Sequence, residues 1–375
     1  MSRIYNLLFI ITSIFLTVFS YSFIDPNLSY LNSIYTGFSL NQRLITSLLF
    51  FIIISAMFFF YFMVCKQTYK NKIKAGTIKK IVLGVSLILI FSYPAMVSYD
   101  IFNYTTTAKV LFGYRENPYI VMPIEFTNDE FLSYTHAANK TALYGPFWLI
   151  LTAVPYVLAS WNFIIMLFSF KLLIALFYFL ILFMIWKITK NKISVVFFAL
   201  NPLVLFETFV GGHNDVVMMF FALLSIYLLS KKKIIFSAVS FFLSVMVKFA
   251  TLFLIPVYIY LFWLKFRGKI IIWEKVYLLS ALLMFLIFLL SPLREEIYPW
   301  YFIWVLVFIS LTKNIKYFIL TGVFSFFLML RYMPFMYLGN HFGITPYLKI
   351  GITFGPLLFI IGILAYLSLF KYKRE

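Results

Sequence analysis

Residues 98–120 read SYDIFNYTTTAKVLFGYRENPYI, and residues 139–148 read NKTALYGPFW. Together they bracket the only long segment of this chain that a lipid bilayer could not hold. The segment carries five of the chain's twelve acidic residues: Asp100, Glu116, Glu125, Asp129 and Glu130. A charged side chain costs about 2.5–3.5 kcal/mol at the bilayer centre, so carboxylates gathered beside a membrane need a reason. We therefore expect residues 99–145 to form a long external loop that carries the chemistry, presented by a membrane scaffold.

The composition excludes an ordinary soluble protein. The 375 residues are 64% hydrophobic and only 11% charged, whereas charged residues make up roughly a quarter of a soluble domain. Hydrophobic runs of about 15–25 residues recur without strand-like alternation, so helices would satisfy the backbone in lipid. The sequence predicts an all-α, polytopic transmembrane protein, a single domain over residues 1–375 with about twelve helices. They are expected near residues 4–24, 43–64, 80–98, 162–186, 193–209, 216–230, 234–248, 250–264, 276–292, 299–312, 317–333 and 350–370.

Two hydrophobic runs need separate treatment. The run at residues 147–159 follows a Tyr-Gly-Pro turn and contains a proline, and it is shorter than the roughly 20 residues that span a bilayer. We expect it to be a re-entrant or interfacial helix. The first run, residues 4–24, has no small-residue cleavage site before Asp25, which favours a retained helix over a cleaved signal peptide.

The net charge of +19 indicates membrane topology rather than a nucleic-acid partner. No basic globular domain exists to carry a nucleic-acid-binding face. If the basic connectors face the cytoplasm, alternate loops obey the positive-inside rule and both termini are cytoplasmic. We expect a multi-pass plasma-membrane protein with its active site outside. The connector residues are Lys66, Lys70, Lys72, Lys74, Lys79, Lys80, Lys187, Lys190, Lys192, Lys231, Lys232, Lys233, Lys265, Arg267, Lys269, Lys275, Lys313 and Lys316.

Asp100 follows the third hydrophobic run, in which Pro94 would bend or end the helix. It could act as a general base at the membrane surface and take a proton from an incoming hydroxyl. The alternative is an ordinary carboxylate at a helix end that faces water. The turn formers ENPY and YGP lie in the same loop. Aromatic residues around them could stack on sugar rings or simply mark a membrane interface: Tyr104, Tyr114, Tyr119 and Tyr144.

A second polar cluster lies in NPLVLFETFVGGHNDVVMMF, residues 201–220. Asn214 or Asp215 could cap the helix that follows. Glu207 lies inside an apolar run, where a capping role is not available, and this favours a binding site. We expect Glu207, His213, Asn214 and Asp215 to orient substrate hydroxyls.

Two basic residues and an aromatic stretch complete the candidates. Lys248 and Arg331 lie apart from the basic connectors, and each could hold a lipid phosphate or extend to lipid headgroups. The stretch LREEIYPWYFIW forms either a substrate-binding rim or an interfacial belt, through Arg294, Tyr298, Trp300, Tyr301 and Trp304. Lys171 has no evident role. His136 and His341 are isolated, and no nucleotide or zinc motif occurs, so we expect neither a metal nor a cofactor.

In these motifs the chain resembles the integral-membrane glycosyltransferases of the GT-C superfamily, particularly polyprenol-phosphate-mannose-dependent α-mannosyltransferases. The resemblance rests on SYDIFNY, on the G-x-x-x-NPY that follows, on YGP, on NPLVLFE leading to GGHND, on VKFATL around Lys248, and on YPWYFIW. It spans residues 98 to about 305. The resemblance implies a catalytic aspartate at Asp100, a polyprenyl-phosphate-linked sugar donor and inversion at the anomeric carbon without an obligatory metal.

The expected reaction is therefore transfer of a hexose, with mannose as the expected sugar, to a glycan or glycolipid acceptor at the outer face of the bilayer. Asp100 would deprotonate the acceptor, and Lys248 and Arg331 would stabilise the departing phosphate. The alternative is a transporter or flippase of lipid-linked glycans. Transport sites usually lie near the membrane midplane on broken helices, whereas the acidic residues here gather near one face.

Overall fold

The computed structural model describes residues 2–24, 37–94, 96–159, 162–293 and 296–372. In these ranges every regular element is a helix, which confirms the all-α prediction. The α-helices are α1 (Ser2–Ser20), α2 (Phe38–Asn41), α3 (Arg43–Tyr69), α4 (Ala75–Ile90), α5 (Asp100–Ala108), α6 (Pro146–Leu151), α7 (Ala153–Ala159), α8 (Phe163–Thr189), α9 (Lys192–Ala199), α10 (Pro202–Leu205), α11 (Asp215–Ser230), α12 (Ile234–Val247), α13 (Ile255–Phe266), α14 (Trp273–Leu290), α15 (Ile303–Ile309), α16 (Ile315–Leu330), α17 (Met333–Leu338) and α18 (Thr345–Tyr372).

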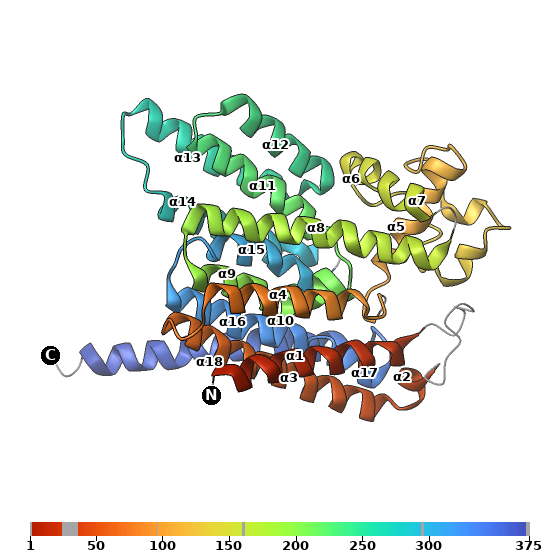
Figure 1. Cartoon of the computed structure of the whole chain (residues 1–375), viewed down its shortest axis with the longest axis horizontal. Coiled ribbons are helices and arrows are strands. Elements are labelled where there is room, and N and C mark those ends of the chain that lie inside the picture. The colour runs from red at the N-terminus through yellow and green to blue at the C-terminus, as the bar shows by residue number, and fades with distance from the viewer. Residues whose placement is uncertain (1, 25–36, 95, 160–161, 294–295, 373–375) are drawn as a thin grey trace.

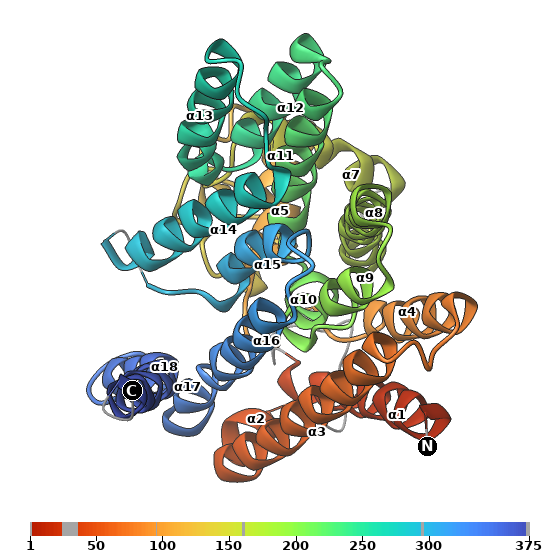
Figure 2. The ribbon, with the colours of Figure 1, turned by 90° about the vertical axis from the view of Figure 1, so that its left-hand side faces the viewer.

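Helices α9, α10 and α15 lie in the middle of the bundle, with α1, α3 and α4 on one side and α11 to α13 on the other (Figure 2). Nearly every residue of these three central helices is buried. The π-helical turn Phe206–Val210 that follows α10 is also entirely buried. The segment that leads from α10 into the GGHND motif therefore lies in the core of the protein.

Six described helical segments are long and apolar enough to cross a membrane: Arg3–Phe23, Arg43–Tyr69, Phe163–Thr189, Phe249–Phe266, Trp273–Leu293 and Ile315–Leu338. A seventh is formed if Lys192–Ala199 and Pro202–Val210, bent by 53°, are one span. Several expected spans are shorter helices, and the predicted count of about twelve is not confirmed. For example, α12 has 14 residues. At 1.5 Å per residue this is about 21 Å, less than the roughly 30 Å of bilayer hydrocarbon.

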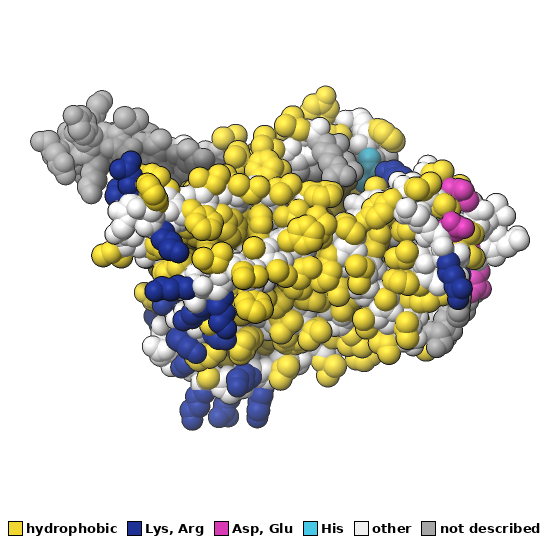
Figure 3. Space-filling view, turned by 90° about the horizontal axis from the view of Figure 1, so that it is seen from above, with side chains coloured by type: hydrophobic (Ala, Val, Ile, Leu, Met, Phe, Trp, Pro, Cys, Tyr) yellow, Lys and Arg dark blue, Asp and Glu magenta, His cyan; other side chains and the backbone are white. Residues whose placement is uncertain are grey.

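The two ends of the bundle differ in charge. In Figure 3, most visible Lys and Arg side chains gather toward one end, and the visible Asp and Glu side chains lie at the other. We call these the basic end and the acidic end. Helix α1 begins and α18 ends toward the basic end (Figure 1). This arrangement is the one that the positive-inside rule predicts for a chain whose two termini share one side of the membrane.

The expected external loop is only partly a loop. Its first residues form α5, whose residues Ile101 and Phe102 are completely buried. The segment beyond α5 lies at the acidic end and is braced internally by Asp129. That carboxylate accepts from Lys109 Nζ at 2.7 Å and from Tyr114 Oη at 2.8 Å. Tyr114, a candidate for sugar stacking, therefore makes its contacts within this segment, and its ring stacks on Phe126. The expected re-entrant run folds as α6 and α7, too short together to cross a bilayer.

Lys171, for which the sequence suggested no role, supports the end of α4. Its side chain is fully buried within α8. Its Nζ donates to the Ser92 carbonyl at 2.6 Å and to Ser92 Oγ at 3.1 Å, just beyond the last turn of α4. A side-chain donor at a helix C-terminus satisfies carbonyls that have no partner within the helix. Lys171 thus ties α4 to α8.

Replacing Lys171 with Met is expected to lower the free energy of unfolding by about 1–3 kcal/mol, because the Ser92 carbonyl would lose its buried donor. Thermal unfolding of the purified protein in detergent measures the change. Lys187→Met, at an exposed position of the same helix, is the matched control and should change stability by no more than about 0.5 kcal/mol. Equal losses in the two variants would contradict the assigned role.

Candidate functional site

A cavity of about 350 Å³ at the acidic end brings together motifs that lie up to 200 residues apart in the sequence. Six of the predicted site residues line it: Asp100, Tyr144, Lys248, Tyr298, Trp300 and Tyr301. Two of these residues, Asp100 and Lys248, carry charges of opposite sign. The cavity thus offers a carboxylate, an ammonium group and an aromatic wall around one space.

Two glycines explain how the chain closes around this cavity. Gly145 packs against the backbone at the end of α12, where a Cβ atom would collide with the Met246 carbonyl, and its N–H donates to the Val247 carbonyl at 3.0 Å. This contact places Tyr144 beside Lys248. Gly212 has a left-handed backbone, with φ of 67°, and lies against Ile101 of α5. It therefore lets the GGHND turn approach Asp100.

Asp100, His213 and Glu207 form a row of charged groups that runs from the cavity into the core. Asp100 Oδ2 lies 3.3 Å from His213 Nδ1, and Glu207 Oε2 lies 3.3 Å from His213 Nε2. The imidazole and Glu207 are fully buried, whereas the Asp100 side chain is 26% exposed. Neither His213 nitrogen makes a well-aligned hydrogen bond in the described part of the chain, so these contacts are ion pairs that a bound substrate could tighten.

Aromatic and hydroxyl groups fix this row in place. The Trp300 ring stacks on His213 with centroids 4.0 Å apart, and Tyr298 stacks on Trp300 at 4.3 Å. On the buried side, Tyr332 Oη donates to Glu207 Oε1 at 2.8 Å. The sequence gave no signal for Tyr332, because a tyrosine in an apolar helix resembles any other core aromatic.

The ion pairs shift the pKa values of Asp100 and His213, which lie outside the membrane-spanning segments. Burial alone would raise the pKa of Asp100, but the adjacent His213 side chain, with Lys248 and Tyr144, lowers it below its ordinary value. Burial alone would lower the pKa of His213, but the two flanking carboxylates raise it to about 9. At neutral pH the Asp100 carboxylate is therefore ionised and His213 is an imidazolium.

The His213 pKa predicts how stability depends on pH. The folded pKa of about 9 lies above the ordinary value of 6.5, so the imidazolium stabilises the folded protein fully below pH 6.5. This stabilisation, on the order of 3 kcal/mol, is lost as the pH rises through about 9. We expect the unfolding midpoint of the protein to fall between pH 7 and 9.5, and His213→Gln to remove most of that fall. A wild-type midpoint that stays level over this range would contradict the ion-pair assignment.

Asp215 holds Lys248 at the cavity. Its Oδ2 accepts from Lys248 Nζ at 2.7 Å and its Oδ1 accepts from Trp304 Nε1 at 2.6 Å. Asp215 is fully buried at the first turn of α11, whereas the Lys248 side chain is 16% exposed. Both carboxylate oxygens are thus engaged by the protein, and these contacts orient the ammonium group of Lys248. Trp304, the last residue of the YPWYFIW motif, belongs to the predicted aromatic rim, but the sequence gave no signal for its contact with Asp215. Arg294, the basic residue of that rim, lies outside the described residues.

The remaining predicted residues near the cavity lie behind or beside it. Asn214 begins the turn into α11 but makes no side-chain cap, and its buried amide has no hydrogen-bond partner among the described residues. Tyr104 lies behind Tyr144, with ring centroids 4.7 Å apart, and its hydroxyl accepts from the Asn214 N–H at 3.3 Å. Tyr119 is 42% exposed and its hydroxyl donates to the Tyr144 carbonyl at 2.7 Å, outside the cavity lining.

Arg331 lines a second cavity, of about 360 Å³, that lies beyond Tyr298 and Trp300. Its Nε donates to the Ile297 carbonyl at 2.8 Å and its Nη1 to Thr353 Oγ1 at 3.1 Å. The two cations predicted to hold phosphate, Lys248 and Arg331, therefore lie in different cavities. His136 and His341 also line the second cavity. In the described ranges, no three His, Cys, Asp or Glu side chains are placed to hold a metal ion.

Comparison with known protein families gives one match. The family model described as alpha-(1->6)-mannopyranosyltransferase, N-terminal domain, matches residues 10–265, more than half of the chain. The matched region contains Asp100, His213, Asp215 and Lys248 and ends before the aromatic wall at Tyr298. No curated protein and no solved structure matches the chain. The protein belongs to the alpha-(1->6)-mannopyranosyltransferase family and is a membrane glycosyltransferase whose function is mannosyl transfer.

Proposed function

We propose that this mannosyltransferase takes mannose from a polyprenyl-phosphate carrier and transfers it, with inversion at the anomeric carbon, to a hydroxyl of a glycan or glycolipid. The observation that carries the proposal is the pairing of Asp100 and Lys248 across one cavity. The ionised carboxylate suits a base for the acceptor, and the ammonium group suits a counter-ion for the leaving phosphate. Membership of a transferase family sets aside the transporter alternative.

Asp100 is the proposed general base. As the acceptor oxygen forms its bond to the anomeric carbon, its proton passes to the Asp100 carboxylate. The bond from the anomeric carbon to the phosphate oxygen breaks, and its electron pair leaves with the polyprenyl phosphate. Because the pKa of Asp100 is lowered, the carboxylate is always ionised at working pH. It accepts the proton only when the developing bond has made the acceptor hydroxyl acidic.

Lys248 is the proposed partner of the leaving phosphate. A polyprenyl phosphate leaves as an anion, so the site needs positive charge rather than a proton donor. The two hydrogen bonds that Asp215 accepts, from Lys248 and Trp304, fix the ammonium group before substrate binds. A preorganised charge of this kind requires no rearrangement during the reaction.

A lipid-linked donor also fits the surroundings of Lys248. The next residue, Phe249, lines the cavity and begins the spanning segment Phe249–Phe266. Phe249 is 60% exposed and Phe253, one turn further on, is 36% exposed. A phosphate at Lys248 would thus lie at the end of a membrane-spanning helix, beside apolar side chains that a polyprenyl chain could contact.

The aromatic wall is the proposed sugar-binding surface. Tyr298, Trp300 and Tyr301 line the cavity, and aromatic faces pack well against the apolar faces of sugar rings. The imidazolium of His213 lies directly behind Trp300. The buried Asn214 amide, which has no hydrogen-bond partner among the described residues, is the proposed contact for a sugar hydroxyl. By the positive-inside rule the cavity would open to the outer face of the plasma membrane, with both termini in the cytoplasm.

The test is mannosyl transfer by the purified protein in lipid vesicles. Polyprenyl-phosphate-linked mannose is supplied in one reaction and nucleotide-linked mannose in another, with a mannoside that carries an alkyl chain as acceptor. We expect an α-(1→6)-linked product from the lipid-linked donor alone. Transfer from nucleotide-linked mannose at an equal rate would overturn the proposed donor.

A further inference from the structure

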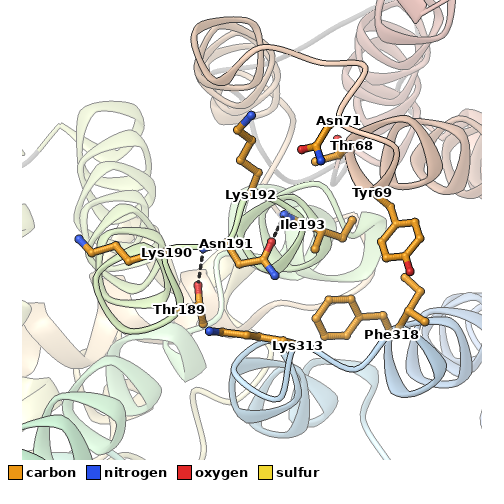
Figure 4. A pocket seen from close by; sticks show the side chains of 11 residues that line it. Thr68, Tyr69, Asn71, Thr189, Lys190, Asn191, Lys192, Ile193, Lys313 and Phe318 are labelled. Carbon is orange, nitrogen blue, oxygen red and sulfur yellow. Dashed lines mark hydrogen bonds between the residues drawn. The ribbon is translucent and has the colours of Figure 1, made fainter.

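The basic end contains a pocket of about 460 Å³, far from the Asp100 cavity along the bundle. It lies where α3 and α8 end and where α9 and α16 begin, and its lining includes Lys190, Lys192 and Lys313 (Figure 4). Figure 4 shows Lys192 and Lys313 on opposite sides of the Asn191 side chain. Two separate connectors, one between α8 and α9 and one between α15 and α16, thus bring positive charge to one hollow.

The charges in this pocket are not neutralised by the protein. No acidic residue lines the pocket, and no described carboxylate forms an ion pair with its three lysines. Hydrogen-bonding side chains lie beside the lysines: Thr68, Asn71, Thr189 and Asn191. The Asn191 carboxamide oxygen accepts from the Ile193 N–H at 3.0 Å, which leaves its NH₂ group as a donor. The hydroxyls of Thr68 and Thr189 already donate to the carbonyls of Val64 and Ile185. The groups left to bind a phosphate are therefore the lysine ammonium groups and the asparagine NH₂ groups.

An apolar groove begins at the same lysine. It has a volume of about 390 Å³, runs between α4 and α8, and shares Lys192 with the basic pocket. Its lining includes Leu83, Phe183 and Trp186, which are 58%, 56% and 41% exposed. A free phosphate ion would fill only the basic pocket. A ligand with an anionic head and a hydrocarbon tail would fill both spaces.

We propose that the pocket and the groove together bind one anionic glycerophospholipid. Lys192 and Lys313 hold its phosphate, Lys190 adds charge at the rim, and one acyl chain lies along the groove past Leu83. Basic pockets between membrane helices at a lysine-rich face are suited to anionic headgroups, and each nearby lysine contributes about 1 kcal/mol of attraction. The site would join the end of α8 to the start of α16. It does not depend on the chemistry proposed for Asp100.

The first test removes the charge. Protein reconstituted in phosphatidylcholine nanodiscs is titrated with phosphatidylglycerol, and bound lipid is counted by native mass spectrometry. The double variant Lys192→Gln/Lys313→Gln is expected to bind phosphatidylglycerol about tenfold more weakly or worse. The matched control Lys231→Gln/Lys233→Gln removes the same charge from exposed positions of the basic end outside the pocket. An equal loss in the control would overturn the site.

The second test separates a lipid from a free phosphate. Leu83→Trp fills the groove at an exposed position, and Leu87→Trp, one turn along α4 and 60% exposed, lies outside the groove lining. We expect Leu83→Trp to weaken phosphatidylglycerol binding severalfold, and Leu87→Trp to leave it unchanged. Glycerol phosphate, which has no acyl chain, should bind far more weakly than the lipid to the wild type. Equally tight binding of glycerol phosphate, undisturbed by Leu83→Trp, would overturn the lipid assignment.

Discussion

The variant Asp100→Asn is expected to lower the rate of mannose transfer by about 10²–10⁴-fold, the usual contribution of a general base. Asparagine has nearly the same shape, so α5 should still begin at this position and the cavity should keep its form. The asparagine carboxamide cannot take the proton from the hydroxyl group of the acceptor sugar. The loss should appear in kcat with little change in KM, because binding of the two substrates does not require proton transfer. Initial rates of transfer from the lipid-linked donor, at equal amounts of folded protein, measure this effect.

Glu130→Gln is the matched control for this experiment. Glu130 is an exposed acid of the same segment and does not line the cavity. Its neutralisation should leave the transfer rate within about twofold of wild type, since surface substitutions rarely change a site. If Asp100→Asn were as active as this control, Asp100 would have no part in the chemistry.

The sequence was informative about this site because charged residues are scarce in the chain. A carboxylate or an ammonium group within apolar sequence carries a high free-energy cost, so Asp100, Glu207 and Lys248 could be selected without a structure. The YPWYFIW stretch could be selected for its density of aromatic residues. These choices identified six residues that line one cavity, although they lie in four separate motifs.

The sequence could not tell which of the selected residues share a cavity. Lys248 and Arg331 look alike in sequence, since each is a single cation at the edge of an apolar run. Their separation depends on tertiary packing, which turns Arg331 toward the Ile297 carbonyl and Thr353. In the same way, only packing shows that Lys171 supports the end of α4 and that Asp215 faces Lys248.

The sequence also could not fix the number of spanning helices, because that number depends on tertiary packing as well. Hydropathy reports how apolar a segment is, but a span also needs sufficient length. Helices α11 and α12 are strongly apolar, yet they have 16 and 14 residues and pair with each other as a short hairpin. An apolar residue in such a helix can face either a neighbouring helix or the lipid. Only the structure shows which of the two it faces.

The variant Lys248→Gln is expected to lower kcat by about 10²–10³-fold, as does the loss of one preorganised group that stabilises a developing negative charge. Glutamine can still donate a hydrogen bond to Asp215 but carries no charge for the leaving phosphate. The buried Asp215 carboxylate would also lose its counter-ion, so some loss of stability is expected. Transfer kinetics and thermal unfolding, measured on the same preparation, separate the two effects.

Two further variants, Lys248→Arg and Arg331→Gln, show whether the rate lost in Lys248→Gln is due to the missing charge or to general damage to the fold. Lys248→Arg keeps the charge and should restore part of the rate lost in Lys248→Gln. Arg331→Gln removes a cation from the neighbouring cavity, where its contacts with Ile297 and Thr353 are structural. It should lower the unfolding midpoint and leave kcat within a few-fold of wild type. If Arg331→Gln instead lowered kcat a hundredfold while Lys248→Gln did not, the leaving phosphate would lie in the second cavity. Asp100 would then be on the wrong side of the aromatic wall to act on its acceptor.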